Sequence, residues 1–356
     1  MSKTRVAVLF GGVSSEYEVS LMSACSVIRN IPADKYEVVC IGITKKGRWL
    51  YYPGGVEQIE RGDWETHPDC TTAVISPDRS HRGILKMMDD GSYNLLKVDC
   101  VFPVLHGKNG EDGTIQGLLA VAGLPFVGCD TLSSADCMDK AVTHTLLDAA
   151  GIRTARWLSF GKTALADLDG AARQAEEVLG FPVFVKPANA GSSVGVNKAQ
   201  NAEDFKEAVK IAFAHDSKVI VEELITGREV ECAVLGNDAP AAGIPGEITS
   251  CKEFYDYEAK YILGASELHI PARISPEALA SLRETAVKAF QVLGCAGLAR
   301  VDFFVTENEE IILNEINTIP GFTSISMYPK MWEAAGLPYP ELIDRLITLA
   351  MERAEG

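Results

Sequence analysis

Two carboxylates and an amide stand close together late in the sequence, and their side chains are of the kinds that bind divalent metal. Glu315 and Asn317 are two residues apart in the run 311–317 (IILNEIN), so on a strand they share one face. If that run pairs with residues 298–305 (LARVDFFV), Asp302 approaches them. Carboxylate and amide oxygens are the hard ligands that magnesium prefers. A solvated acidic hairpin is the alternative that these residues leave open.

The residues around this cluster add groups that bind anions. Residues 318–324 (TIPGFTS) form a Pro-Gly loop directly after the second run, and backbone N–H groups in such a loop can hold an oxyanion. Arg300 stands two residues before Asp302, on the same face of the strand, and its guanidinium suits a carboxylate or a phosphate. These neighbours favour a metal and anion site over a simple acidic hairpin.

A glycine-rich loop occurs earlier, in residues 181–198 (FPVFVKPANAGSSVGVNK). Its glycines let the backbone approach a phosphate closely. The loop lacks the Gly-Lys-Ser/Thr ending of a Walker loop and leads into another strand, so it joins two strands; a plain hairpin turn is the alternative. Lys186 before the loop and Lys140 at the end of residues 133–140 (SSADCMDK) are cations in an acidic protein. Both are candidates for holding phosphate.

Two further acids follow this unit, Glu222 in VIVEEL and Glu229 in GREV. Their carboxylates could accept hydrogen bonds from an adenine amino group and from ribose hydroxyls, or they could be exposed surface acids. Neither the loop 11–16 (GGVSSE) nor the glycine loop matches Gly-x-Gly-x-x-Gly. That difference counts against a dinucleotide-binding dehydrogenase.

The elements that must position these residues change character along the chain. The first third alternates buried-strand runs with amphipathic helices, which predicts an open, mainly parallel α/β sheet. Ligands gather at the carboxyl ends of such strands, where we expect the loops 11–18 and 106–113 to lie. Residues 52–92 are polar and weakly periodic and read as an addition to that sheet. Two α+β units follow, and the second contains a helix over 275–294 that begins Ser-Pro-Glu and stops at a glycine.

Composition excludes several classes of partner. A chain of 356 residues is longer than one hydrophobic core usually supports, so we expect two or three domains around a cleft. A formal net charge of −16 opposes binding to nucleic acid. Nine cysteines without a Cys-x-x-Cys pair read as reduced thiols. With no signal peptide and no apolar run near the roughly 18 residues of a membrane span, we expect a soluble, cytoplasmic protein that binds no membrane.

Taken in order, seven motifs closely resemble the D-alanine:D-alanine ligase family of the ATP-grasp superfamily. They extend from residue 11 to residue 324 and read GGVSSEYEVS, PVLHGKNGEDGTIQG, SSADCMDK, VKPANAGSSVG, YDYEAKY, RVDFF and NEINTIPGFTS. The resemblance implies an ATP-grasp fold, with an N-terminal open parallel α/β domain (1–135) and two α+β units (136–222 and 223–356) that clamp ATP. It also implies a mobile lid loop at about 246–268.

The resemblance assigns roles to the residues that match. ATP would be held by Lys140, Lys186, Ser193, Glu222 and Glu229. Two magnesium ions, which manganese could replace, would be bound by Asp302, Glu315 and Asn317. The first D-alanine would meet Glu16 through its ammonium and His106 near its carboxylate, and the second D-alanine's carboxylate would meet Lys260 and Ser326. Arg300 and the backbone of Gly321 would stabilise the tetrahedral intermediate, and Tyr261 would close the lid by reaching Ser192 and Glu16.

The implied reaction makes D-alanyl-D-alanine for peptidoglycan precursors through an acyl phosphate. Relatives that make D-alanyl-D-lactate carry histidine where this chain has Tyr261, so an amine acceptor is expected. D-alanine is preferred to D-serine because Tyr255 and Met327, where the second pocket is expected, add no charge. Ile325 departs from the family, which commonly has histidine there.

Three alternatives remain open. They are a D-alanine:D-serine ligase, a ligase of the glutathione-synthetase kind, and a non-catalytic nucleotide-binding protein of the same fold. Family members are usually homodimers through the N-terminal domain, so a homodimer is also expected here.

Overall fold

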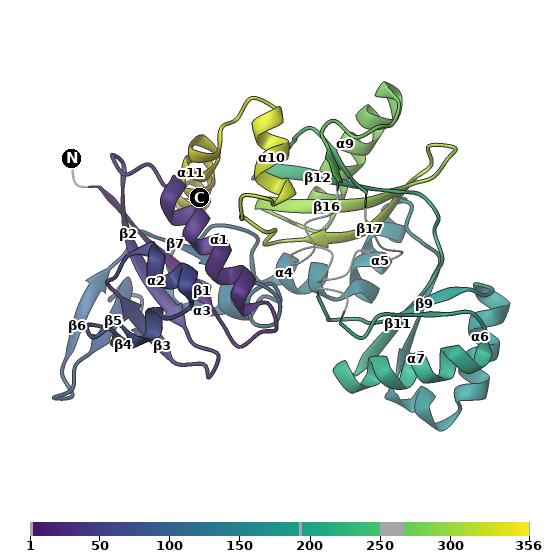
Figure 1. Ribbon diagram of the computed structural model, residues 1–356, viewed down its shortest axis with the longest axis horizontal. Helices are drawn as coiled ribbons and strands as arrows, with labels where there is room; N and C mark the ends of the chain where they lie inside the picture. The colour runs from purple at the N-terminus through teal and green to yellow at the C-terminus, as the bar shows by residue number, and fades with distance from the viewer. Residues whose placement is uncertain (1–2, 192–193, 250–266, 356) are drawn as a thin grey trace.

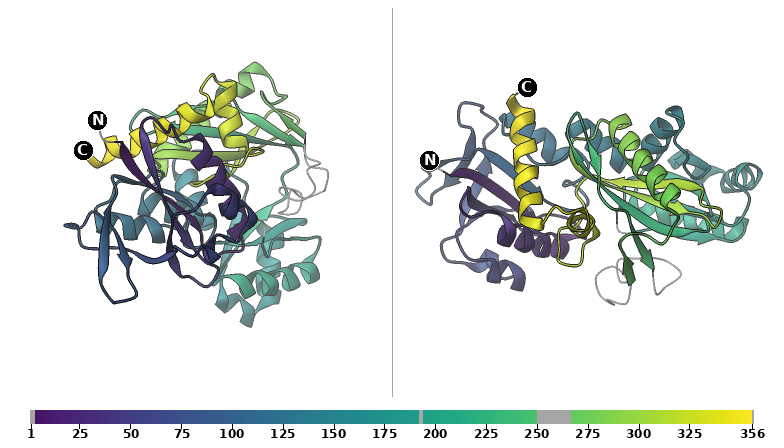
Figure 2. Two further views of the ribbon diagram at one scale, coloured as in Figure 1. Left: turned by 60° about the vertical axis from the view of Figure 1, so that its left-hand side comes forward. Right: turned by 90° about the horizontal axis from the view of Figure 1, so that it is seen from above.

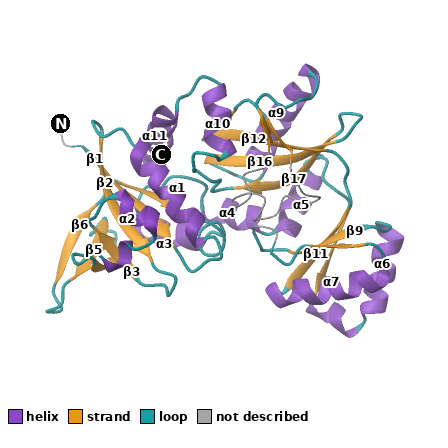
Figure 3. Ribbon diagram, viewed as in Figure 1, coloured by secondary structure: helices purple, strands orange, loops and turns teal. Residues whose placement is uncertain are grey.

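The computed structural model describes residues 3–191, 194–249 and 267–355, and it places three β-sheets side by side with helices on their faces (Figure 1, Figure 3). The first sheet has the strand order β6-β5-β4-β3-β2-β1-β7. At its centre, β1 (Thr4–Gly11) runs parallel to both β2 (Tyr36–Ile43) and β7 (Cys100–Val104). This parallel core agrees with the prediction from the alternating strand and helix runs.

The rest of this sheet is antiparallel. Residues 52–92, which were expected to be only an addition, contain β4 (Thr71–Ile75) and β5 (Gly83–Met87), and they are flanked by β3 (Trp49–Tyr52) and β6 (Tyr93–Lys97). Each of them pairs antiparallel with its neighbour, beginning with β2. The sheet is therefore mixed rather than mainly parallel as a whole, because short connections can join only antiparallel strands. The short helix α2 (Val56–Arg61) and the 3₁₀ turn η1 (Trp64–Thr66) lie between β3 and β4.

Both faces of β1 are covered by helices. Val6 and Val8 pack in one core with α1 (Tyr17–Asn30) and with the last helix, α11 (Tyr339–Glu355). Ala7 packs in another core with α3 (Thr114–Ala122). Burial on both faces explains why this strand reads as a continuous apolar run rather than an alternating one.

The central unit is a smaller antiparallel sheet of order β10-β9-β11-β8. Its strands are β8 (Trp157–Gly161), β9 (Val183–Pro187), β10 (Asn197–Ala199) and β11 (Lys218–Glu223). The helices α6 (Leu168–Val178) and α7 (Ala202–His215) pack together against the sheet, and the 3₁₀ turn η2 (Lys162–Ala166) follows β8. As predicted, the glycine-rich loop joins two antiparallel strands, β9 and β10.

The third sheet has the order β15-β14-β12-β16-β17, with β13 pairing β12 beside it. Its strands are β12 (Arg228–Gly236), β13 (Ala241–Ala242), β14 (Gly246–Thr249), β15 (Glu267–His269), β16 (Gly297–Val305) and β17 (Ile311–Asn317). The predicted hairpin is therefore β16 and β17, which pair antiparallel. Helix α9 (Pro276–Val292) covers one face and α10 (Met327–Ala334) packs on the other. The Ser275 side chain caps α9, as its sequence predicted.

Three connections hold the units together. Helices α4 (Thr131–Met138) and α5 (Lys140–Ala149) lead out of the first unit. The segment after α5 bonds to both other sheets, because the Leu313 N–H donates to the Arg153 carbonyl and the Glu223 N–H donates to the Arg156 carbonyl. At the end of the chain, α11 returns to the first sheet (Figure 2), where Arg353 donates to the carbonyls of Phe126 and Gly128. No helix among the residues described is long and apolar enough to cross a membrane.

Candidate active site

The predicted metal ligands lie together on one face of β16 and β17. Asp302 is directly opposite Glu315, and Arg300 is directly opposite Asn317. This is the face away from α9, since the alternate residues of β16, such as Val301, pack with that helix. A bulge between Asp302 and Phe303 shifts the register there, and bulges commonly re-aim side chains next to active sites. The alternation in the sequence was therefore sufficient to predict this cluster.

Arg300 organises the acids around it. Its guanidinium donates to both oxygens of Asp302, at 2.7 and 2.6 Å, and lies 3.1 Å from Glu231, which is opposite Asp302 on β12. Burial disfavours the charge on Arg300, but Asp302 and Glu231 outweigh it and raise the pKa of Arg300 well above its usual value. Glu231 escaped the sequence reasoning, because its place depends on β12 pairing with β16.

A fourth acid, Glu111, lies beside the cluster. Glu111 accepts a hydrogen bond from the Gly107 N–H at 2.6 Å. Burial and the neighbouring Glu16 raise the pKa of Glu111 well above its usual value, and Glu315 adds to that shift. The raised pKa favours the uncharged form of Glu111, so the charges of the cluster are those of Asp302, Glu231 and Glu315 against Arg300 and Lys140. The carboxylates of Asp302 and Glu315 with the amide oxygen of Asn317 fit a divalent cation, and magnesium is the ion that this donor set suits best.

Lys140 connects this cluster to the glycine loop. Its Nζ lies 3.6 Å from Glu315 Oε2 and donates to the carbonyl of Ala190 at 3.0 Å. Its backbone N–H donates to the carbonyl of Ala188. Lys140 therefore stands where the central and C-terminal sheets meet, at the first turn of α5, whose N-cap is Asp139. A phosphate held there would meet both the lysine and the loop backbone.

Lys186 and Glu222 form a buried ion pair on neighbouring strands of the central sheet. Lys186 Nζ lies 2.5 Å from one Glu222 oxygen, and His144 Nε2 lies 3.1 Å from the other. Burial works to raise the pKa of Glu222, but Lys186 and His144 together hold that pKa well below its usual range. With only 4% of the residue exposed, the carboxylate is an internal anchor for Lys186, so the alternative of an exposed surface acid is wrong.

His144 escaped the sequence reasoning, although a helical pattern could have revealed it. It lies four residues after Lys140 on α5, and residues at that spacing share a helix face. Glu229 is partly buried on β12, opposite Phe304 on β16 and Ile248 on β14. It projects from the same face of the sheet as Asp302 because it stands two residues before Glu231.

The residues predicted to bind substrate in the first unit lie in the loops at the carboxyl ends of β1 and β7, where we expected those loops. Glu16 directly precedes α1. Its carboxylate packs so closely on the loop after β7 that a Cβ placed on Gly107 would lie 2.5 Å from it, and one placed on Gly191 would lie 3.2 Å away. Gly107 also has a φ of 69°, which favours glycine. Glu16 therefore adjoins the glycine loop just before Ser192.

The remaining predicted residues fall in two groups. Gly321 and Ser326 lie in the loop between β17 and α10, where the Ser326 hydroxyl accepts a hydrogen bond from the Thr323 N–H at 3.0 Å. His106 lies beneath that loop, and both of its ring nitrogens have protein partners, Ile319 O and Ser23 Oγ. Met327 is buried, whereas Ile325 is half exposed. The other residues fall outside those the structure describes, namely Ser192, Ser193, Tyr255, Lys260 and Tyr261.

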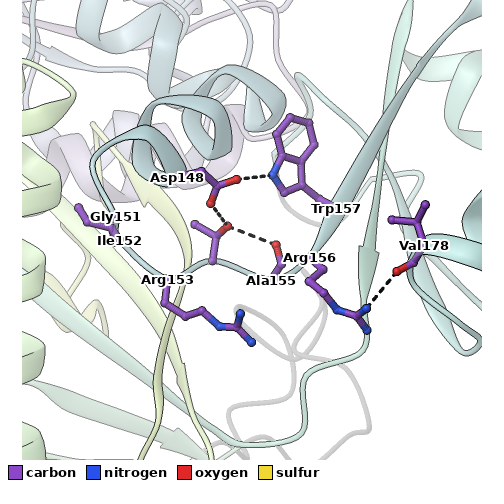
Figure 4. A pocket seen from close by; sticks show the side chains of 9 residues that line it. Asp148, Gly151, Ile152, Arg153, Ala155, Arg156, Trp157 and Val178 are labelled. Carbon is purple, nitrogen blue, oxygen red and sulfur yellow. Dashed lines mark hydrogen bonds between the residues drawn. The ribbon is translucent and has the colours of Figure 1, made fainter.

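A groove of about 500 Å³ opens beside the segment that links α5 to β8 (Figure 4). Asp148 accepts hydrogen bonds there from the Thr154 hydroxyl and the Trp157 indole N–H. None of the predicted site residues lines it. The groove therefore belongs to the joint between the units rather than to the acid cluster.

Together, the three sheets and the cations and acids that meet between them define the ATP-grasp class of enzyme. Residues 5–129 match the family model described as D-ala D-ala ligase N-terminus, and residues 146–348 match the model described as D-ala D-ala ligase C-terminus. The chain is 51% identical to a D-alanine–D-alanine ligase of Acetivibrio thermocellus, with 99% of this chain and 96% of that protein covered.

Solved structures agree with these matches. The fold is similar to that of the VanG D-Ala:D-Ser ligase from Enterococcus faecalis, with a TM-score of 0.90, 46% identity and coverage of 98% of this chain and 100% of that one. It is also similar to that of the D-alanine-D-alanine ligase from Coxiella burnetii, with a TM-score of 0.86, 38% identity and coverage of 99% and 96%. The chain belongs to the D-alanine–D-alanine ligase family, whose members use ATP and generally need magnesium.

Proposed function

We propose that this enzyme joins two D-alanines into D-alanyl-D-alanine for peptidoglycan precursors, at the expense of ATP. The observation that carries the proposal is the cluster of Asp302, Glu315 and Arg300, tied through Lys140 to the glycine loop. It brings a metal-binding acid pair, a phosphate-binding lysine and a carboxylate-binding arginine to one place. A non-catalytic binding protein would have no need for the whole set.

In the first half of the reaction, a carboxylate oxygen of one D-alanine attacks the γ-phosphorus of ATP, and the bond to the β-phosphate oxygen breaks. Lys140 and Lys186 offset the charge on the phosphates, while Glu16 binds the ammonium of this D-alanine. Asp302, Glu315 and Asn317 would hold two magnesium ions, which when bound neutralise phosphate charge. Ser193, Glu222 and Glu229 complete the proposed nucleotide site, with Glu222 acting through Lys186.

In the second half, the amine of the other D-alanine attacks the acyl carbon. The amine loses a proton, the carbon–oxygen bond to phosphate breaks, and inorganic phosphate leaves. Arg300 and the N–H of Gly321 stabilise the oxyanion. Lys260 and Ser326 hold the incoming carboxylate. Tyr261, with Ser192 and Glu16, closes residues 246–268 over the site, because water would otherwise hydrolyse the acyl phosphate.

The second candidate function is D-alanine:D-serine ligation, which the similarity to VanG favours. The two are separated by giving the enzyme ATP, magnesium and D-alanine with equal D-serine or D-lactate, and by identifying the dipeptide by mass. D-alanyl-D-alanine as the main product supports the proposal, whereas mainly D-alanyl-D-serine would replace it with the second candidate.

We further infer three domains, a homodimer and a cytoplasmic location. Each of the segments 1–135, 136–222 and 223–356 holds one sheet to within a residue. Exposed apolar side chains on β4 and β6, among them Val74, Tyr93 and Leu95, support a dimer through the first unit. The cysteines that the structure describes are free thiols, as suits a reducing compartment. Light scattering on purified protein tests the dimer, since a monomeric mass would contradict it.

A further inference from the structure

A chain of buried hydrogen bonds links the first unit to the substrate loop between β17 and α10. His106 Nδ1 lies 3.1 Å from the carbonyl oxygen of Ile319, and its Nε2 lies 3.1 Å from Ser23 Oγ. The Phe322 N–H donates to the same Ser23 oxygen at 3.3 Å. Ser23 is 0% exposed and His106 is 5% exposed. Two residues of the first unit therefore contact the loop on either side of Gly321.

The proton positions in this chain follow from the partners. A carbonyl oxygen only accepts, so the Nδ1 of His106 must carry a proton and donate to Ile319. Burial lowers the pKa of His106 against the opposing effect of Glu16, which favours the neutral ring. Nε2 is then an acceptor, so the Ser23 hydroxyl donates to it and accepts from the Phe322 N–H. Each polar atom in this chain of hydrogen bonds is therefore matched with a partner.

The same loop is held at further points around Gly321. The Tyr339 hydroxyl donates to the carbonyl of Phe322 at 2.5 Å. The Ile319 N–H donates to Asn317 Oδ1 at 3.1 Å. Residue 320 is proline, which has no N–H and a restricted φ. The peptide that carries the Gly321 N–H is therefore fixed from both sides, as a preorganised oxyanion donor must be.

We propose that Ser23 and His106 are positioning residues that set the direction of the Gly321 N–H for the second half of the reaction. His106 holds the loop by donating to the Ile319 carbonyl. Ser23 holds both His106, through its Nε2, and the loop, through the Phe322 N–H. This inference rests on the proposed ligase function and assigns Ser23 a role that the motifs did not suggest.

The test separates the two halves of the reaction in Ser23→Ala. The first half is followed by exchange of oxygen-18 between the β,γ-bridge and the β-nonbridging positions of ATP with D-alanine present. The second half is followed by the rate of dipeptide formation at saturating ATP and D-alanine. We expect label exchange to fall by no more than about threefold while the rate of dipeptide formation falls about 100-fold, since a displacement of about 1 Å can cost about that much.

Ser20→Ala is the matched control. Ser20 lies one turn earlier on α1, is also 0% exposed, and bonds to Gly11 and Val104 within the first unit. It should lower stability in a similar way and leave the rate of dipeptide formation unchanged. Ser23→Cys keeps the size of the side chain but bonds weakly, and it replaces Ser23→Ala if that variant does not fold.

A double-mutant cycle tests whether the pair acts as one unit. His106→Asn keeps an N–H near the Nδ1 position but loses the hydrogen bond to Ser23. Adding Ser23→Ala to this variant should therefore lower the rate of dipeptide formation little further. The proposal would be overturned if Ser23→Ala slowed both half-reactions equally. It would also be overturned if the fold-decreases in dipeptide formation of the two single variants multiplied in the double variant. An unchanged rate of dipeptide formation in both Ser23 variants would overturn it as well. Absence of any dipeptide from the wild-type enzyme would instead contradict the ligase function itself.

Discussion

The ammonium of Lys140 lies 3.6 Å from the Glu315 carboxylate, which ties the first turn of α5 to strand β17. The lysine belongs to the connection toward the central unit and the acid to the C-terminal sheet. Their contact therefore joins the two units directly. The phosphate groups of a nucleotide bound there would lie next to Lys140 and Glu315. The predictions below begin with this pair.

Glu315→Gln should lower dipeptide formation at least about 100-fold, because it removes one proposed metal ligand and the charge opposite Lys140. The fold should persist, since about a third of this side chain is exposed. Phosphate release and thermal melting measure the two effects. Glu310→Gln is the control, an exposed acid paired with Arg153 just before β17. Full activity of the Glu315 variant would remove the metal assignment.

Glu222→Gln should raise the KM for ATP and destabilise the fold by about 3 kcal/mol, because Lys186 is left buried without its anionic partner. Urea denaturation without nucleotide measures the stability. The pKa of Glu222 is lower in the folded state than in the unfolded state. Its contribution to the free energy of unfolding is therefore complete above the unfolded-state pKa of about 4.3, and it is lost as the pH decreases through the folded-state pKa. Equal stability of variant and wild type at pH 7 would contradict this anchoring role.

Glu247 offers a second pH test, at the strand that leads into residues 250–266. Its carboxylate bonds to Arg273 and Arg228, and hydrogen bonds from Arg273, against burial, lower its pKa to about 2. Because the pKa of Glu247 is lower in the folded state than in the unfolded state, its ionised carboxylate stabilises the fold at higher pH. Glu247→Gln should therefore lower the free energy of unfolding by roughly 2–3 kcal/mol at pH 7. The difference from wild type should shrink between about pH 4 and pH 2. A pH-independent difference would point to packing instead.

Gly107→Ala should impair binding of the first D-alanine, because the new Cβ would displace Glu16 and Ser14, at 2.5 and 2.8 Å. Gly151→Ala is a close control. It has the same φ of 69° but nothing within 4 Å of the new Cβ. Both variants should lose roughly 1–2 kcal/mol from the backbone conformation, while only the first should raise the KM for D-alanine. Similar KM values in both would remove Glu16 from the substrate site.

Much of the fold and site could be predicted from local patterns. Alternation in β16 and β17 gave the register that brings Asp302 to Glu315. The cap at Ser275 marked the start of α9. Strands β3 to β6 were missed because their periodicity is weak and their pairing is set by neighbours along the sheet.

The site residues that sequence reasoning did not find were missed for a different reason. Ser23, Glu231 and His144 each gain a role only through a partner more than 70 residues away. The sequence around Ser23 and Glu231 carries no sign of that partner, and for His144 only the four-residue spacing from Lys140 on α5 is visible. The same holds for Glu222, whose anchoring depends on His144 as well as on Lys186.

The return of α11 to the first sheet has a consequence for biosynthesis. Leu342 and Leu346 complete the core that begins with Val6 and Val8. During translation β1 is made long before the helix that covers one of its faces. The apolar side chains on that face therefore stay uncovered until α11 has been synthesised, so the nascent first sheet cannot complete its core alone.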